Sequence, residues 1–285
     1  MPDMPCRSRP LLVALCLCWL GLAACAMRAP LAPADQARLA ALLPTELLLV
    51  GEQHDAPEHQ RLQRQLVEWL AARGQLAALT LEMAERGQST ASLPRDAGAA
   101  EVRRALAWDD AGWPWSAYGP VVMAAVRAGV PVLGANLPRS GLRAAMADAA
   151  LDARLPAAAL AEQRQRLRDG HCGLLPETQL APMTRVQIAR DIAMAEVAAG
   201  ARQRGRTVLL VAGNGHVHRA LGVPRHLPPD VQARVLAASA EPAPSAMHTV
   251  ADELGAELVW RTPARPPRDY CSELVRAAPT PPQSR

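Results

Sequence analysis

The stretch Leu47-Leu48-Leu49-Val50-Gly51-Glu52-Gln53-His54-Asp55 decides the fold class of this 285-residue chain. It begins as a short apolar run, which is typical of a buried parallel strand, and then breaks at a glycine. The residues that follow predict a helix start, with Asp55 as the N-cap and Glu58 completing a capping box. Glu52 and His54 therefore fall where a strand becomes a helix, and this edge is where open α/β sheets bind ligands.

The same pattern of an apolar run followed by a polar side chain recurs along the sequence. The next three runs are Ala78–Leu81 before Glu82, Val130–Ala135 before Asn136, and Thr207–Ala212 before Gly213-Asn214-Gly215-His216. Residues 231–237 and 257–261 are further strand candidates. This alternation predicts an α/β fold, a mostly parallel sheet flanked by helices. Each polar residue alone is open to a reading as a cap or a turn, but His and Glu are not favoured turn residues.

The segments between the strands predict a small inserted helical subdomain beside the sheet. We place the α/β domain at 45–262, with helical insertions at about 86–117 and 139–180, and a Pro-rich tail at 263–285 that is extended or disordered beyond Cys271. The first insertion contains the aromatic segment from Trp108 to Tyr118, which either packs as a corner or walls an apolar ligand site. A helix over residues 183–199 carries Arg190, which is either a surface residue or a member of the rim.

The first residues are typical of a bacterial targeting segment. Residues 1–24 form the predicted signal peptide, and Leu22-Ala23-Ala24-Cys25 resembles a lipobox with Cys25 as the lipid acceptor. The alternative is an ordinary cleaved signal with a chance cysteine. Residues 25–44 are then a tether and a first helix. Because Ala26 rather than Asp follows Cys25, we expect a lipid-anchored protein of the outer membrane, facing the periplasm or the surface.

The composition predicts a disulfide and argues against nucleic acid as a partner. Cys172 and Cys271 are the only cysteines after Cys25, so an oxidising compartment predicts that they pair. All 31 basic residues are arginine and the net charge is +4. They form no basic patch interleaved with aromatic residues, so nucleic acid is not an expected partner.

Two Gly-x-x-His motifs, Gly51–His54 and Gly213–His216, give the chain a resemblance to a known family. It resembles the ChaN-like haem-binding lipoproteins, which are grouped with the Tiki and TraB proteins and, more distantly, with erythromycin esterases. The resemblance also rests on Glu82, on Arg190-Asp191-x-x-Met194-Ala195, and on Val217-x-Arg219 after the second motif. It extends from about Leu47 to Tyr270, and it implies a parallel sheet with flanking helices and a small helical subdomain.

The resemblance implies two different functions. The first is haem binding in haem or iron uptake, with a homodimer that forms around haem and an outer-membrane haem transporter as a possible partner. The second is a metal-dependent hydrolase. His54, His216, Glu52 and Glu82 would then hold a divalent ion, with Glu52, Glu82 and Arg190 as the catalytic candidates. A scaffold without either activity is a third interpretation.

The site candidates follow from the predicted strand ends. The rim would contain Asn136, Arg190 and Asn214 beside the histidines and glutamates. For the haem iron, tyrosinate and histidine are known ligands, and the chain contains only two tyrosines. Tyr118 is the better placed, because Tyr270 adjoins the predicted disulfide and the tail.

Overall fold

The computed structural model describes residues 30–240, 253–266 and 268–277. The chain divides into an N-terminal unit up to Leu39 and a main unit from Ala40 onward. Helix α2, Pro33–Ala40, agrees with the expected first helix. The predicted signal peptide and Cys25 lie outside the described residues. Within the described ranges, none of the helices combines the length and hydrophobicity that a membrane span requires.

The main unit is built on a six-stranded sheet in the order β3-β2-β4-β1-β5-β6, and all its pairings are parallel. The strands are β1 Leu47–Glu52, β2 Leu76–Glu85, β3 Val132–Asn136, β4 Thr207–Gly213, β5 Ala233–Ser239 and β6 Leu258–Arg261. Every residue of β1 and β4 is buried, which explains their continuous apolar runs. The predicted α/β class and the six strand positions are confirmed.

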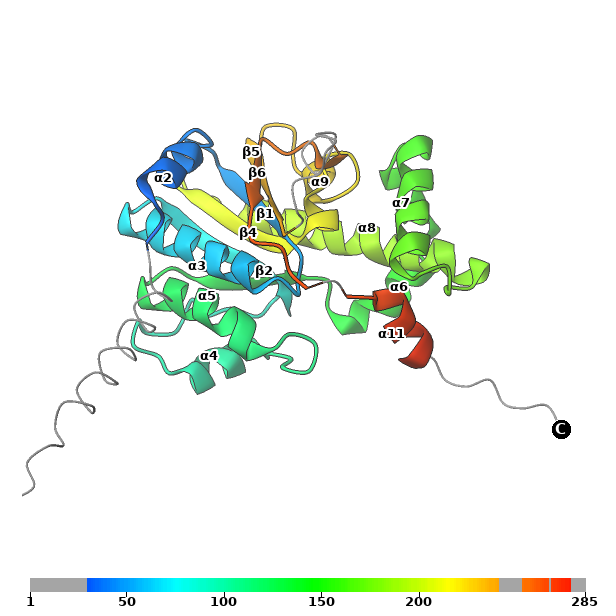
Figure 1. Cartoon of the computed structure of the whole chain (residues 1–285), viewed down its shortest axis with the longest axis horizontal. Coiled ribbons are helices and arrows are strands. Elements are labelled where there is room, and N and C mark those ends of the chain that lie inside the picture. Colours follow the sequence, from blue (N-terminus) through cyan, green and yellow to red (C-terminus); the bar gives the residue numbers. More distant parts are fainter. Residues whose placement is uncertain (1–29, 241–252, 267, 278–285) are drawn as a thin grey trace, which may run out of the picture. The chain divides into compact units, whose positions relative to one another are not determined.

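Three long helices cover the two faces of this sheet (Figure 1). The chain passes from β1 through α3, Pro57–Ala72, to β2, and then through α5, Trp115–Arg127, to β3. It returns through α8, Glu177–Gly200, to β4. Because parallel crossovers are right-handed, the reversal of direction puts α8 on the face opposite α3 and α5. On that face Met194, Ala195 and Ala198 of α8 belong to the same buried core as Leu47 and Leu49.

Further helical elements lie between the strands. They are α4 Ala99–Ala105, η1 Arg139–Gly141, α6 Leu142–Ala147, η2 Ala149–Arg154 and α7 Ala157–Gly170. The remaining short elements are η3 Asn214–Val217, α9 Val223–His226 and α11 Tyr270–Ala277. Helix α8 begins at Glu177, six residues before the predicted start at Met183. Residues 177–182 are therefore the first part of the long helix.

Three local predictions were wrong. Asp55 does not cap α3, because the N-cap is Ala56, whose side chain can accept nothing, and Pro57 begins the helix. Strand β2 does not end before Glu82 but continues, with an irregular register between Leu81 and Glu85, to pair with the end of β3. The expected extended or disordered tail beyond Cys271 is helical up to Ala277, because residues 270–277 form α11, and the rest of the tail lies outside the described residues.

The predicted disulfide is confirmed. Cys172, in the turn between α7 and α8, is bonded to Cys271 in α11, and their Cα atoms lie 5.5 Å apart. The bond closes a sequence separation of 99 residues, and such a cross-link removes a large entropy from the unfolded chain. It therefore ties the C-terminal helix to the helical insertion.

Candidate functional site

Glu52 is the hub of a buried hydrogen-bond network at the carboxyl end of β1. The residue is 2% exposed, and its carboxylate accepts hydrogen bonds from Gln60 at 2.7 Å and Gln63 at 2.5 Å. The hydroxyl of Tyr118 donates to it at 2.6 Å and Nδ1 of His54 lies 2.7 Å away. Since a buried charge is costly unless it is hydrogen-bonded, these four partners explain how a carboxylate remains in the core.

Glu82 of β2 links the two Gly-x-x-His motifs. It is 3% exposed and accepts a hydrogen bond from the backbone N–H of Gly213 at 2.8 Å. Its two carboxylate oxygens lie 3.7 Å from Nε2 of His54 and 3.4 Å from Nε2 of His216. Nδ1 of His216 in turn donates to Asp191 at 2.5 Å. The polar cluster therefore runs from Glu52 through His54, Glu82 and His216 to Asp191, and we call these five residues the rim cluster.

The two motif glycines are needed because each motif packs against the other. A Cβ on Gly51 would lie 2.3 Å from Oδ1 of Asn214 and 2.5 Å from a methyl carbon of Val217. A Cβ on Gly213 would lie 2.8 Å from Nε2 of His54. Both glycines are on neighbouring strands and face each other's motif, since Glu52 pairs in register with Gly213. A side chain at either glycine would therefore push the two motifs apart, and the glycines allow both histidines to lie at one edge of the sheet.

The charges of the rim cluster are strongly coupled. Burial opposes the charge on His216, but the adjacent carboxylates of Glu82 and Asp191 outweigh it and raise the His216 pKa to about 10. Burial likewise opposes the ionisation of Glu82, but the His216 charge and hydrogen bond lower the Glu82 pKa to about 2. Burial raises the pKa of Asp191 to about 6. At neutral pH His216 is therefore an imidazolium held between two carboxylates.

His54 is the member of the rim cluster that reaches solvent. Its side chain is 39% exposed, compared with 7% for His216. Burial lowers its pKa, but the hydrogen bond to Glu52 and the Glu82 charge outweigh this effect, and the net pKa is raised. The ring of Trp113 packs edge-on against the His54 ring, with 4.8 Å between centroids. Access to the cluster is consequently past His54 and Trp113.

The aromatic segment is a packed corner around Tyr118. Trp108 and Trp113 have ring centroids 6.2 Å and 5.8 Å from that of Tyr118, and Trp115 packs against Trp108 at 5.0 Å. Tyr118 is 2% exposed. Burial and the neighbouring Glu52 charge raise the pKa of its phenol above the ordinary value. In this arrangement the phenol is a protonated donor to Glu52, and iron cannot reach it without breaking that bond.

The other predicted rim residues support the backbone more than the cluster. Asn136 donates to the carbonyl of Glu82 at 2.9 Å, and Asn214 donates to the carbonyl of Ala238 at 3.0 Å. Arg190 is half-buried, and its Nε has no hydrogen-bond partner among the described residues. His218 lies away from the cluster, with Nε2 at 3.6 Å from Glu162.

The cluster as it stands does not fit a metal ion. No group of three or more His, Cys, Asp and Glu side chains within the described ranges is arranged to hold one. Both ring nitrogens of His216 face carboxylates, with Nε2 3.4 Å from Glu82 and Nδ1 2.5 Å from Asp191. The two histidines and two glutamates predicted as ligands do come together, but hydrogen bonds and protons link them.

Sequence reasoning missed three members of this site. Asp191 holds the second histidine, and Gln60 and Gln63 hold Glu52 from the first turns of α3. Asp191 was part of the helical motif that carries the family resemblance, so a signal existed for it. The two glutamines face the sheet three residues apart, which is one helical turn, but amides at that spacing are common on solvated faces.

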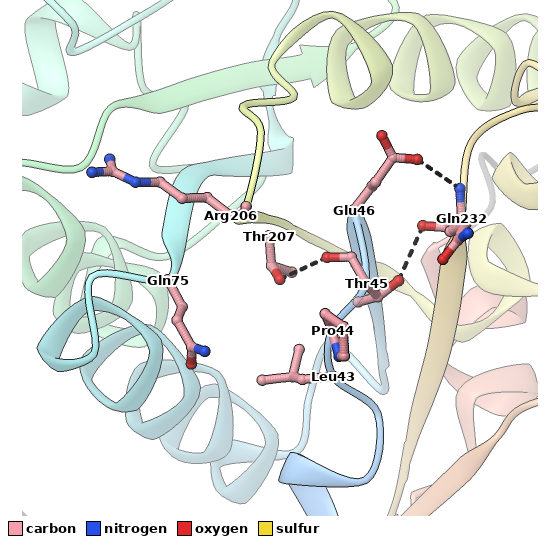
Figure 2. Close-up of a pocket in the computed structure, with 9 residues that line it drawn as sticks. Leu43, Pro44, Thr45, Glu46, Gln75, Arg206, Thr207 and Gln232 are labelled. Carbon is pink, nitrogen blue, oxygen red and sulfur yellow. Dashed lines mark hydrogen bonds between the residues drawn. The ribbon is translucent and has the colours of Figure 1, made fainter.

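The opposite edge of the sheet holds a cavity of about 150 Å³ that carries no comparable chemistry (Figure 2). Thr207 donates to the carbonyl of Thr45 at 2.8 Å, and Thr45 donates to the carbonyl of Gln232 at 3.0 Å. The carboxylate of Glu46 accepts from the Gln232 backbone at 2.9 Å. These groups satisfy one another, so the candidate site is the carboxyl edge.

Comparison with known families identifies the chain. A family model described as haem-binding uptake, Tiki superfamily, ChaN, matches residues 38–227. The chain belongs to this haem-binding uptake family. The match includes both Gly-x-x-His motifs, Glu82 and Asp191, and it ends before β5 and α11. No functionally curated protein matches the chain.

One solved structure agrees with the fold of the family. The structure titled cofacial heme binding to ChaN of Campylobacter jejuni is 23% identical, with a TM-score of 0.61, and the match covers 73% of this chain and 87% of that one. The type III effector HopBA1 is 15% identical, with 77% and 88% covered and a TM-score of 0.41. A Bacillus cereus protein is 13% identical, with 73% and 69% covered and a TM-score of 0.42. Only the first supports the shared fold.

Proposed function

We propose that this chain is a lipid-anchored haem-binding protein of the bacterial outer membrane that takes part in haem or iron uptake. The observation that carries the proposal is membership of the haem-binding uptake family over residues 38–227. The half-exposed His54 beside Trp113 supports it, because a porphyrin needs an apolar surface near a potential iron ligand.

Haemin titration of the mature protein tests the binding function. We expect a Soret band that shifts and saturates at a defined ratio of haemin to protein. If the ligand also brings two copies together, sub-stoichiometric haemin should raise the sedimentation coefficient. A spectrum identical to that of free haemin at micromolar concentrations would refute haem binding, whatever the oligomeric state.

The anchor is supported by the sequence Leu22-Ala23-Ala24-Cys25 after an apolar run. A thioether-linked diacylglycerol at Cys25, with a further acyl chain, would hold the protein on a membrane, because one chain alone binds only marginally. We expect Cys25→Ala to release a soluble or uncleaved form. A processed Cys25→Ala protein that still sediments with outer membranes would exclude the anchor. The partner that receives the haem would be an outer-membrane transporter, which cross-linking in intact cells can identify.

A metal-dependent hydrolase is the second candidate, and the rim cluster is the one observation in its favour. Such a reaction needs His54 and His216 on a common ion, which the described geometry does not provide. The two candidates differ in one direct measurement. Stoichiometric zinc or manganese in protein purified without chelator, together with no response to haemin, would favour the hydrolase.

A further inference from the structure

The edge of the sheet opposite the rim cluster, where the parallel strands begin, holds a second and larger cavity. We call this the amino edge. The cavity has a volume of about 390 Å³ and lies between the start of β2, the turn before β3 and the turn before β4. Its polar lining residues are Arg95, Gln203 and Arg206, and the lining contains no aspartate or glutamate. Two guanidinium groups without a carboxylate suit an anion with several oxygen atoms.

Neither arginine of this cavity is neutralised within the described part of the chain. No aspartate or glutamate there lies within ion-pair distance of Arg95 or Arg206. By contrast, Arg202, in the same turn as Arg206, pairs with Glu46 at 3.1 Å. Figure 2 shows the Arg206 side chain extending away from Glu46. An arginine in the last turn of a helix is ordinary, because it faces the negative end of the helix dipole, but Arg95 and Arg206 belong to loops.

The turns before β3 and β4 supply donors to the cavity from either side of β2. Arg95 packs so closely over Gly129 that a Cβ on this glycine would lie 2.3 Å from Nε of the arginine. Gly129 also has a φ of +73°, a backbone conformation that favours glycine. On the other side, Nη1 of Arg206 donates to Oε1 of Gln203 at 3.4 Å. The amide nitrogen of Gln203 remains as a further donor.

An apolar cavity adjoins the cationic one. It has a volume of about 130 Å³ and shares Gly129, Val130 and Pro131 with its larger neighbour. Apart from one threonine, the rest of its lining is apolar and includes Leu93 and Val126. Free phosphate would use only the cationic cavity. An anion that carries a hydrocarbon part would use both, because its methylene groups would leave water for the apolar cavity.

The tether joins the main unit at this same edge. The main unit begins at Ala40, and β1 starts at Leu47, which pairs in register with Val208 of β4. Cys25, the proposed lipid acceptor, precedes this entry point in the sequence. Along the chain, the amino edge is therefore the part of the sheet nearest to the anchor. Phospholipids are the amphiphilic anions that an anchored protein meets at the highest local concentration.

We propose that the cavity between Arg95 and Arg206 binds the phosphate of an anionic phospholipid, with the glycerol and the first methylene groups in the adjoining apolar cavity. This inference rests on the proposed lipid anchor for the source of the lipid, and it is independent of haem binding. The binding is non-covalent. The two guanidinium groups donate charge-assisted hydrogen bonds to the phosphate oxygens, and Gln203 adds a neutral one.

Calorimetric titration with a short-chain phosphatidylglycerol, below its micelle concentration, tests the site. The protein is the whole chain carrying Cys25→Ala, which has no lipid of its own, and any uncleaved signal peptide is common to all the variants compared. We expect saturable binding at least about tenfold tighter than that of inorganic phosphate, because the methylene groups bury apolar area. Inorganic phosphate that binds as tightly as phosphatidylglycerol would identify a free-phosphate site and overturn the lipid assignment.

Matched variants test the residues. R95Q/R206Q should weaken phosphatidylglycerol binding at least about tenfold, because it removes charge-assisted hydrogen bonds. Q203E, which places a carboxylate beside Arg206, should also weaken it. The control R61Q/R168Q removes the same charge from two exposed arginines that pair with glutamates elsewhere, and it should retain native affinity.

The outcomes separate this site from the proposed function. Native affinity in R95Q/R206Q or in Q203E would overturn the proposal, and so would equal weakening in R95Q/R206Q and R61Q/R168Q, which indicates general attraction of charge. Retained circular dichroism and an unchanged haemin titration in R95Q/R206Q show that the variant is folded. Failure of haem binding would appear in the haemin titration of the native chain, and failure of the anchor in the membrane fractionation of Cys25→Ala. The affinity for short-chain lipid is measured in solution and stays valid in either case.

Discussion

Replacing Tyr118 by Phe isolates the energetic contribution of one buried hydrogen bond to the rim cluster. The hydroxyl donates to the Glu52 carboxylate at 2.6 Å, and the side chain is 2% exposed. The Phe ring keeps the packing against Trp108 and Trp113, so the change removes the bond and little else. Hydrogen bonds to charged groups contribute about 1.5–3 kcal/mol to folding, and we expect the free energy of unfolding to fall by this amount.

Urea unfolding of oxidised protein, followed by tryptophan fluorescence, measures this change. For a domain of this size each kcal/mol lowers the Tm by about 2–4 °C, so thermal unfolding provides a second reading. The control is Tyr270→Phe, which removes the exposed hydroxyl and should change the free energy of unfolding by less than about 0.5 kcal/mol. Equal stabilities for the two variants would refute the assignment of Tyr118 as a structural donor to Glu52.

Three further predictions concern the cluster and the core. Because the His216 pKa is raised from 6.5 to about 10, the protonation of His216 contributes stability that is lost as the pH rises from 6.5 through about 10. In urea titrations, His216→Asn should remove this alkaline loss of stability, whereas the control His218→Asn should retain it. A loss of stability that persists in His216→Asn would contradict the prediction. Gly51→Ala should cost about 1–3 kcal/mol through overpacking. Gly215→Ala meets nothing within 4 Å and should be near neutral, so equal unfolding midpoints would disprove the steric argument. Leu66→Ala, at a fully buried position of α3, should lower the free energy of unfolding by about 2–5 kcal/mol in chemical denaturation. A loss below about 1 kcal/mol would show that neighbouring side chains fill the cavity.

The local sequence was sufficient to predict the strands, because their apolar runs depend only on how deeply each strand is buried. The runs ending at Glu52, Glu82, Asn136 and Gly213 had to be strands of a parallel sheet, because a strand covered on both faces has no polar side to alternate with. The polar residues then had to meet at one edge, since parallel strands share their carboxyl ends. The disulfide followed from the number of cysteines, which left one pairing after Cys25.

Contacts between distant segments were decided by the tertiary structure. The local sequence predicts Asp55 as a helix cap. Its carboxylate instead contacts Arg265 and Tyr270, which lie more than two hundred residues away in the chain. The protonation of His216 depends on Asp191, which only the return crossover through α8 brings to it. Tyr118 lies inside and Tyr270 outside because of how α5 packs and where the disulfide holds α11. Sequence patterns report the burial of a residue's own segment, whereas a pKa or a ligand role depends on charges and surfaces that other segments supply.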